Sequence, residues 1–161
     1  MGRFLPCIYA FFGCAAFCFI FELRRWRYIL SASLCGLVCW LVYLLLEGEA
    51  PSVRYFWATV AVAMLAEVFA RVFKTPATIF LIIGIIPLVP GGGIYYTMEA
   101  MLNGYVFQFT RNGAQTAVCA ATIAVGCSLV SSAARILTLL RLRREQRRRL
   151  RVQDQRQDGR E

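Results

Sequence analysis

Two charged residues stand inside an otherwise apolar segment of this 161-residue chain. Glu67 and Arg71 are four residues apart near the end of the run Tyr55–Phe73, so on a helix they share one face in the order that favours an ion pair. An ionisable side chain within a membrane segment is costly to bury and often marks a substrate or ion path. Two interpretations follow: a structural ion pair, or substrate gating or proton coupling through Glu67 and Arg71.

A second candidate is the apolar stretch Lys74–Met98, with the sequence KTPATIFLIIGIIPLVPGGGIYYTM. Pro87 and Pro90 each lack the N–H that a helix needs and clash with the carbonyl four residues before. The carbonyls of Ile83 and Ile86 would then lack helical donors, which is costly in hydrocarbon unless protein or water replaces them. Broken helices at membrane depth are typical of segments that line a transporter's cavity.

The glycines Gly91, Gly92 and Gly93 follow the second proline and would begin the helix that contains Tyr95. A helix N-terminus presents free N–H groups and the positive end of the helix dipole, so a buried one suits a carboxylate. Glycine also lets a ligand approach the main chain. The other interpretation is a surface loop, for which glycine clusters are equally typical.

The charged pair and the broken stretch together resemble the signature of the threonine/serine exporter (ThrE) family, and more narrowly its small, separately encoded YjjB-like subunit. In that family an AE-x-x-AR element precedes K-x-PA, a FLI-x-G-IIPLVPG run and a tyrosine. Ile83 stands where the pattern usually has a proline, which leaves the helix less broken at that point. The matching positions are Ala66, Glu67, Ala70, Arg71, Lys74, Pro76, Ala77, Phe80–Gly91 and Tyr95.

The resemblance implies a transporter rather than an enzyme. Family members are either fused or split into a large and a small subunit, so it implies a hetero-oligomer with a larger exporter subunit. It implies export of threonine and serine, or of succinate in some split systems, driven by the proton gradient and without a cofactor. The residues expected on the substrate path are Glu67, Arg71, Pro87, Pro90, Gly91, Gly92, Gly93 and Tyr95.

The composition is that of a membrane protein. Hydrophobic residues make up 59% of the chain and the mean hydropathy is +0.59, well above an ordinary soluble domain. The formal charge is +9, and half of the 18 Lys and Arg residues lie in residues 141–161. We therefore expect a membrane-embedded exporter-type helical domain over residues 1–140 and a disordered basic cytoplasmic tail over residues 141–161.

The apolar runs predict an all-α, polytopic fold with about five transmembrane helices, the fourth broken at Pro87, Pro90 and Gly91–Gly93. Basic residues follow the first, third and fifth runs. The positive-inside rule then places the N-terminus outside and the C-terminus in the cytoplasm of a cell-membrane protein. The predicted runs are 4–21, 29–46, 55–73, 77–98 and 114–140.

The sequence offers little for catalysis or metal binding. It contains no His, the commonest general base, and no Walker loop, dinucleotide fingerprint or nucleophile triad. We therefore expect no enzyme and no catalytic residue. The seven cysteines stand in apolar runs without a CxxC motif, which favours packing over a metal site or a disulfide scaffold.

The basic tail leaves a second function class open. Its arginines are not interleaved with aromatic residues, so a nucleic-acid stacking platform is absent, and we expect no nucleic-acid partner. A polybasic segment directly after a span typically contacts anionic lipid headgroups. The alternative to an exporter subunit is a non-transporting membrane scaffold that recruits a partner through this tail.

Overall fold

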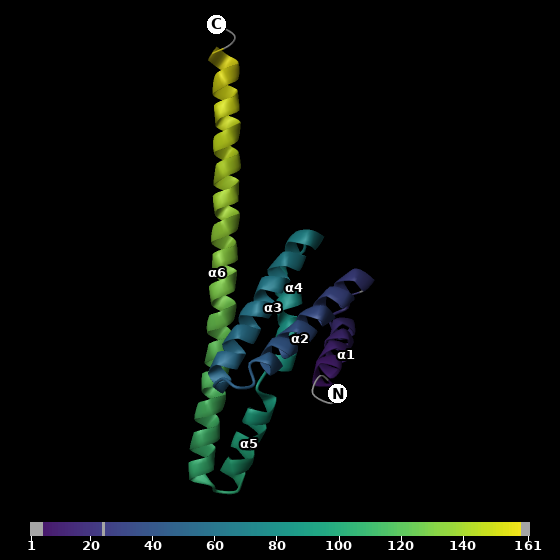
Figure 1. The fold of residues 1–161 in the computed structure, drawn as a ribbon, viewed down its shortest axis with the longest axis vertical. Coiled ribbons are helices and arrows are strands. Elements are labelled where there is room, and N and C mark those ends of the chain that lie inside the picture. Colours follow the sequence, from purple (N-terminus) through teal and green to yellow (C-terminus); the bar gives the residue numbers. More distant parts are fainter. Residues whose placement is uncertain (1–4, 24, 159–161) are drawn as a thin grey trace.

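The computed structural model describes residues 5–23 and 25–158, and every element in those ranges is helical (Figure 1). This confirms the predicted all-α class. The elements are α1 (Leu5–Ile20), α2 (Trp26–Leu45), α3 (Pro51–Phe73), α4 (Ala77–Ile85), the 3-10 turn η2 (Ile86–Leu88), α5 (Gly91–Leu102) and α6 (Val106–Asp158).

Prolines and residues with a left-handed backbone conformation determine where several helices begin or end. Pro51 begins α3, at a position where its missing N–H has no helical partner to lose. Lys74 ends α3 with a φ of 53° and donates its N–H to the carbonyl of Ala70. After α1, Glu22 adopts a φ of 54°. These two left-handed residues turn the chain sharply, so α2 runs back along α1 and α4 runs back along α3.

Within residues 5–23 and 25–158, three helices are long and apolar enough to cross a membrane, and the bent pair formed by α4–η2 and α5 adds a fourth candidate. α1 has 16 residues, or about 24 Å of helix, which is shorter than a hydrocarbon core of roughly 30 Å. The run predicted over residues 4–21 exceeds α1 because the chain leaves the helix before Glu22; residue 4 lies outside the described residues. The five-span count thus depends on α1 and remains a prediction.

The last helix differs from what the sequence led us to expect. We predicted a span over residues 114–140 and a disordered tail, but α6 is continuous over 53 residues. Its apolar part is Val106–Thr138, which starts earlier than the predicted run. The backbone stays helical to Asp158 because Arg, Leu, Glu and Gln are strong helix formers and extending a formed helix needs no new nucleus.

The core lies where α2 packs against α1, α3, α4 and η2, and where α3 packs against α4. Its largest fully buried side chains, Phe80, Ile83 and Leu88, come from α4 and η2, so the segment that the prolines interrupt lies at the centre of the bundle. Most neighbours are small, which lets membrane helices approach closely. They include Cys14, Cys18, Ala32, Cys35, Cys39, Ala58, Val62 and Ala66.

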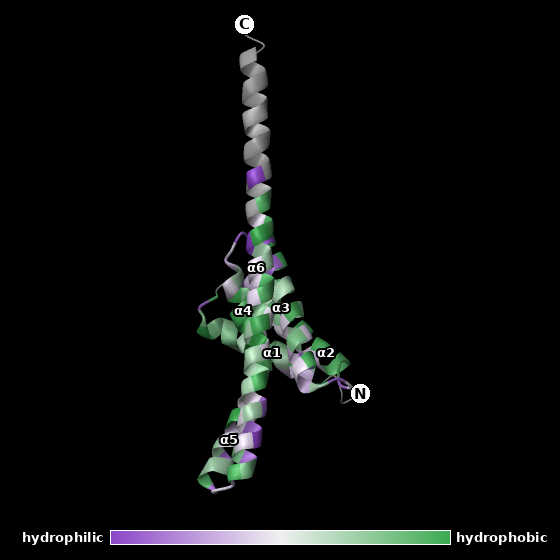
Figure 2. Cartoon of the chain, turned by 90° about the vertical axis from the view of Figure 1, so that its left-hand side faces the viewer, coloured by the Kyte–Doolittle hydropathy of each residue, from purple (hydrophilic) through white to green (hydrophobic). Residues whose placement is uncertain are grey.

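Polar residues gather at the ends of the bundle, while its helices are mostly hydrophobic (Figure 2). The α1–α2 loop with Arg25, the α3–α4 turn with Lys74 and the C-terminal end of α6 lie toward one end of the molecule (Figure 1). The start of α1, the α2–α3 loop and the α5–α6 turn lie toward the other end. The fold therefore brings these basic segments to one side of the molecule.

We predict that Gly84→Ala destabilises the bundle. A Cβ at this position would stand 2.6 Å from Cγ2 of Val62 and 2.8 Å from Cβ of Cys35, and such overpacking costs about 1–3 kcal/mol. Gly13→Ala in α1 is the matched control, since a Cβ there meets nothing within 4 Å. Thermal unfolding in detergent should show a lower midpoint for Gly84→Ala alone; equal midpoints would contradict the packing at Gly84.

Candidate functional site

The predicted break is present and consists of two consecutive irregular turns. α4 passes into the 3-10 turn η2 at Ile86, and α5 begins at Gly91 with Pro90 as its N-cap. Pro90 has φ −76° and ψ 56°, and the N–H of Gly91 donates to the carbonyl of Val89 over 2.7 Å. This is an inverse γ-turn. The two halves of the segment meet at a bend of 49°.

The carbonyls that the prolines deprive of helical donors are satisfied inside the protein. The carbonyl of Ile83 accepts the N–H of Ile86 and also the thiol of Cys14, whose Sγ lies 3.3 Å away. The carbonyl of Ile86 accepts the N–H of Val89 over 3.2 Å. A 3-10 turn and a thiol from α1 thus replace the lost bonds, so neither carbonyl is left for a ligand.

The backbone N–H groups at the start of α5, unlike these carbonyls, are not all satisfied within the protein. The first N–H groups of a helix have no intrahelical acceptor. The first regular bond of this helix runs from Ile94 N–H to the carbonyl of Pro90. Gly91 uses its N–H in the γ-turn, and the N-cap provides no side-chain hydrogen bond. The N–H groups of Gly92 and Gly93 therefore remain for a ligand or water.

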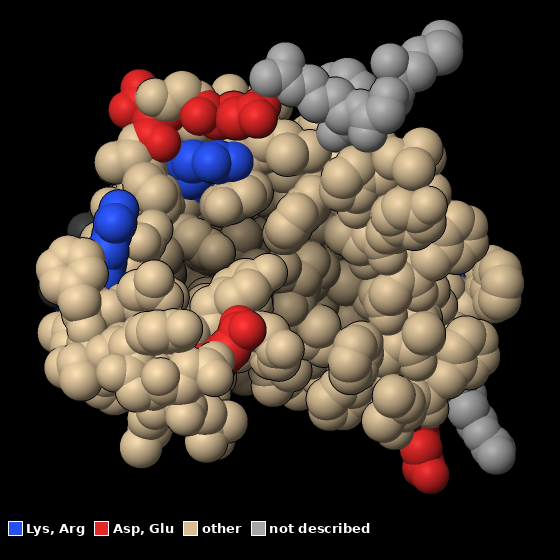
Figure 3. Space-filling model, turned by 90° about the horizontal axis from the view of Figure 1, so that it is seen from below, with Lys and Arg blue, Asp and Glu red and all other residues tan. Residues whose placement is uncertain are grey.

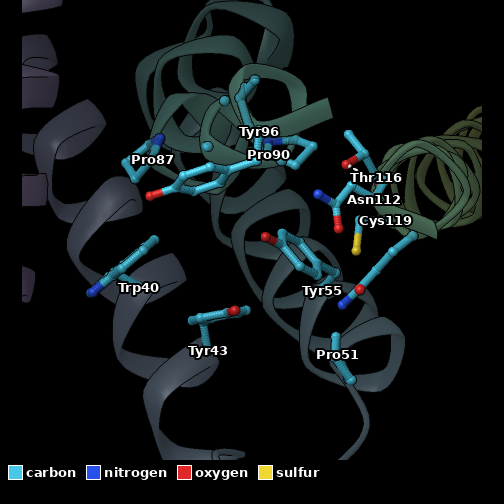
Figure 4. A pocket seen from close by; sticks show the side chains of 15 residues that line it. Trp40, Tyr43, Pro51, Tyr55, Pro87, Pro90, Tyr96, Asn112, Thr116 and Cys119 are labelled. Atoms are coloured by element: carbon cyan, nitrogen blue, oxygen red, sulfur yellow. Dashed lines mark hydrogen bonds between the residues drawn. The ribbon is translucent and has the colours of Figure 1, made fainter. Parts of the chain in front are cut away.

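A cavity of about 640 Å³ lies against this helix start (Figure 4). Seen from below, the molecule is hollowed, and the face around the hollow is mostly uncharged (Figure 3). Residues from α2, α3, η2, α5 and α6 line the cavity: Trp40, Tyr43, Pro51, Tyr55, Pro87, Val89, Pro90, Gly91, Gly92, Gly93, Tyr96, Asn112, Gln115, Thr116 and Cys119.

One wall of the cavity is aromatic. The ring centroids of Trp40 and Tyr43 are 5.2 Å apart, and those of Tyr43 and Tyr55 are 5.1 Å apart. The guanidinium of Arg54 lies 4.0 Å from the centroid of Tyr43 and its Nε donates to the Tyr43 carbonyl over 3.2 Å, which fixes this wall. The indole Nε1 of Trp40 is buried without a hydrogen-bond partner among the described residues.

The opposite wall comes from α6 and is polar. Asn112, Gln115, Thr116 and Cys119 line the cavity at the spacing of one helix face. The hydroxyl of Thr116 donates to the carbonyl of Asn112 over 2.7 Å. Sequence reasoning missed this wall, although three amide or hydroxyl side chains on one face of an apolar helix were a visible signal.

The predicted path residues fall into two groups. Pro87, Pro90 and the three glycines all line the cavity. Tyr95 is not among the lining residues and its side chain is 65% exposed; the neighbouring Tyr96 lies over the cavity instead.

Glu67 and Arg71 lie away from this cavity. Arg71 Nε is 3.9 Å from Glu67 Oε2, and the side chains are 40% and 27% exposed for Arg71 and Glu67, respectively. This is a loose, partly exposed pair of the kind that contributes little to stability. Glu67 also lines a second cavity of about 210 Å³ between α3, α4 and α6. Among the described residues, no group of three or more His, Cys, Asp or Glu could hold a metal ion.

Comparison with known proteins identifies one family. The family model described as Threonine/Serine exporter, ThrE, matches residues 6–133. No curated protein and no solved structure matches the chain. The matched range contains α1 to α5, most of the apolar part of α6 and nearly all residues that line the two cavities.

We predict that Gly92→Val fills the cavity without disturbing the fold. A Cβ at Gly92 meets only Tyr96 Cε2, at 4.0 Å, and Tyr96 lies over the cavity on the same helix face. In an Asn112→Cys background, Gly92→Val should slow labelling by a small thiol reagent several-fold, whereas Gly13→Val, placed in open space, should not. Unchanged labelling would show that Gly92 does not face the cavity.

Proposed function

The chain belongs to the threonine/serine exporter family, and on that premise we propose that it is the small subunit of a two-component secondary exporter in the cell membrane. It would move small carboxylate-bearing metabolites out of the cell. The observation that carries this proposal is the cavity against the start of α5, where a broken membrane segment and free backbone donors meet. Broken helices of this kind form the substrate sites of many transporters.

The substrate carboxylate would bind at the N-terminus of α5. The N–H groups of Gly92 and Gly93 can donate to its oxygens, and the positive end of the helix dipole favours the anion. Hydrogen bonds to an ionised acceptor are the stronger kind. The amides of Asn112 and Gln115 on the facing wall would supply further neutral donors.

The substrate ammonium would lie over aromatic rings. Tyr55, Tyr96 and Trp40 line the cavity, and cations bind above such faces. The face of Tyr43 is already used by Arg54. No Lys or Arg is among the described lining residues, and Arg54 is already engaged with Tyr43, so a second carboxylate would find no free cationic side chain in the wall of this cavity. The walls therefore favour a zwitterion such as threonine or serine over a dicarboxylate such as succinate.

We propose that the N-terminus lies outside and the C-terminus in the cytoplasm, because the basic segments gather at one end of the fold. The cavity at Gly91–Gly93 then opens toward the outer side. Glu67, near the cytoplasmic end of α3, is the candidate for coupling to the proton gradient.

A larger exporter subunit is the proposed partner, and the α5–α6 hairpin is its candidate contact surface. The apolar part of α6 has 33 residues, or about 50 Å of helix, against a hydrocarbon core of roughly 30 Å. The hairpin extends beyond the α2–α3 loop (Figure 1). Its tip exposes Met98 by 63%, Leu102 by 83% and Phe107 by 77%, an apolar surface that a second membrane chain would cover.

The direct test is efflux of labelled threonine, serine and succinate from cells that express the chain with and without the larger subunit. We expect efflux of threonine and serine with both subunits, and little with either alone. Absence of efflux for all three substrates would contradict the proposed function. Efflux of succinate alone would contradict the proposed preference for a zwitterion.

We predict that Pro87→Ala combined with Pro90→Ala abolishes export. The double variant restores helical donors to Ile83 and Ile86, removes the need for the 49° bend and so dismantles one wall of the cavity. Efflux at equal membrane abundance should fall at least about tenfold, while the thermal midpoint stays equal or rises. Pro6→Ala in α1 is the control and should export normally. Normal efflux from the double variant would place the substrate path elsewhere.

A further inference from the structure

We propose that the second cavity is the cytoplasmic vestibule of the same substrate path, and that the contact between Thr59 of α3 and Gly126 of α6 closes the path between the two cavities. This inference rests on the proposed function and extends it to residues outside the broken segment.

The second cavity has the chemistry of a binding site. Its volume is about 210 Å³, and its polar lining consists of Glu67, Thr78, Ser131 and Arg135 from three helices. A carboxylate from α3 and a guanidinium from α6 thus face one space. Such a pair suits a ligand that carries both an ammonium and a carboxylate group, because each charge finds an opposite one. The loose contact to Arg71 at 3.9 Å leaves Glu67 able to exchange its partner.

Both cavities lie along the same two helices. α3 contributes Tyr55 to the first cavity and Glu67 to the second, and α6 contributes Cys119 to the first and Ser131 to the second. The order is the same on both helices, so α3 and α6 run side by side in the same direction (Figure 1). Eight residues separate Tyr55 from Ala63, the first α3 residue that lines the second cavity, and twelve separate Cys119 from Ser131 on α6, so the two linings are about 12–18 Å apart along the helices.

A contact between α3 and α6 falls within this interval on both helices. Thr59 is fully buried, and a Cβ on Gly126 would lie 3.0 Å from Cγ2 of Thr59. The hydroxyl of Thr59 donates to the carbonyl of Tyr55 over 2.7 Å. The methyl group and the Cβ of Thr59, which lies 3.1 Å from a Cβ on Gly126, are therefore presented to Gly126, and the two helices meet there through a small, apolar contact.

A small, apolar contact of this kind allows α3 and α6 to move relative to each other. Packed helices slide past one another by small shear movements during domain motions, and a glycine facing a methyl group offers no hydrogen bond to break. A movement of α6 against α3 at this point would join the two cavities. The added methyl group of Gly126→Ala would oppose that movement, because the contact has no spare room.

The first experiment is a rescue. Gly126→Ala should slow efflux about tenfold at equal membrane abundance, and adding Thr59→Ser, which keeps the hydroxyl and removes the methyl group, should restore part of it, because the Cβ at position 59 stays 3.1 Å from the added Cβ. Gly13→Ala is the control for a helix-interior alanine and should export at the parent rate. Normal efflux from Gly126→Ala, or failure of Thr59→Ser to rescue it at unchanged stability, would overturn the closure at this contact.

The second experiment separates this inference from the proposed function. Ser131→Cys and Asn112→Cys, made singly, should react with a membrane-impermeant thiol reagent from opposite faces of the membrane, measured against the labelling of the parent's own cysteines. Excess threonine should slow both reactions. Protection of Asn112→Cys without Ser131→Cys would overturn the second vestibule and leave the proposed function standing. Protection of neither, together with no efflux from the parent, would overturn both.

Discussion

The need to satisfy every backbone carbonyl at the break constrains this structure more than any other interaction. Inside a membrane an orphan carbonyl is costly, yet Pro87 removes the donor that Ile83 would have used. The structure meets this need with the 3-10 turn and with the thiol of Cys14, 3.3 Å from the carbonyl oxygen. α1 is thereby tied to the break. The orientation of α5, and with it the cavity, depends on this arrangement.

Small residues also determine the packing of the bundle, because they let neighbouring helices approach one another closely. Gly36 faces Cys14 where α1 crosses α2, Gly84 packs α4 against α2 and α3, and Gly126 packs α6 against α3. Close backbone approach through small residues is how membrane helices associate without a hydrophobic driving force. This accounts for a core in which cysteine and alanine surround Phe80, Ile83 and Leu88, and for a bundle whose charged residues lie mostly at its ends.

Features that depend on a residue's own backbone could be predicted from the sequence. Features that depend on contacts between distant segments could not. Pro87, Pro90 and the glycines act on their own backbone, so the break and its position followed from residue types alone. The remaining walls depend on which helices become neighbours: Trp40 and Tyr55 reach the cavity only because α2 packs beside η2 and α3 packs beside α2. Arg135 and Glu67 line one cavity for the same reason. The continuous α6 was missed because hydrophilic composition was taken to indicate disorder, although the same residues favour helix.

The most direct test of the central claim is a titration of the two free backbone donors by NMR in bilayers. With glycine ¹⁵N labelling and assigned spectra of the protein together with its larger subunit, added threonine should shift the amide signals of Gly92 and Gly93 in a saturable way. Threonine amide, which lacks the carboxylate, should leave them unchanged, and Gly13 should respond to neither. Shifts by threonine that spare Gly92 and Gly93, or equal shifts by threonine amide, would contradict a carboxylate site at the start of α5.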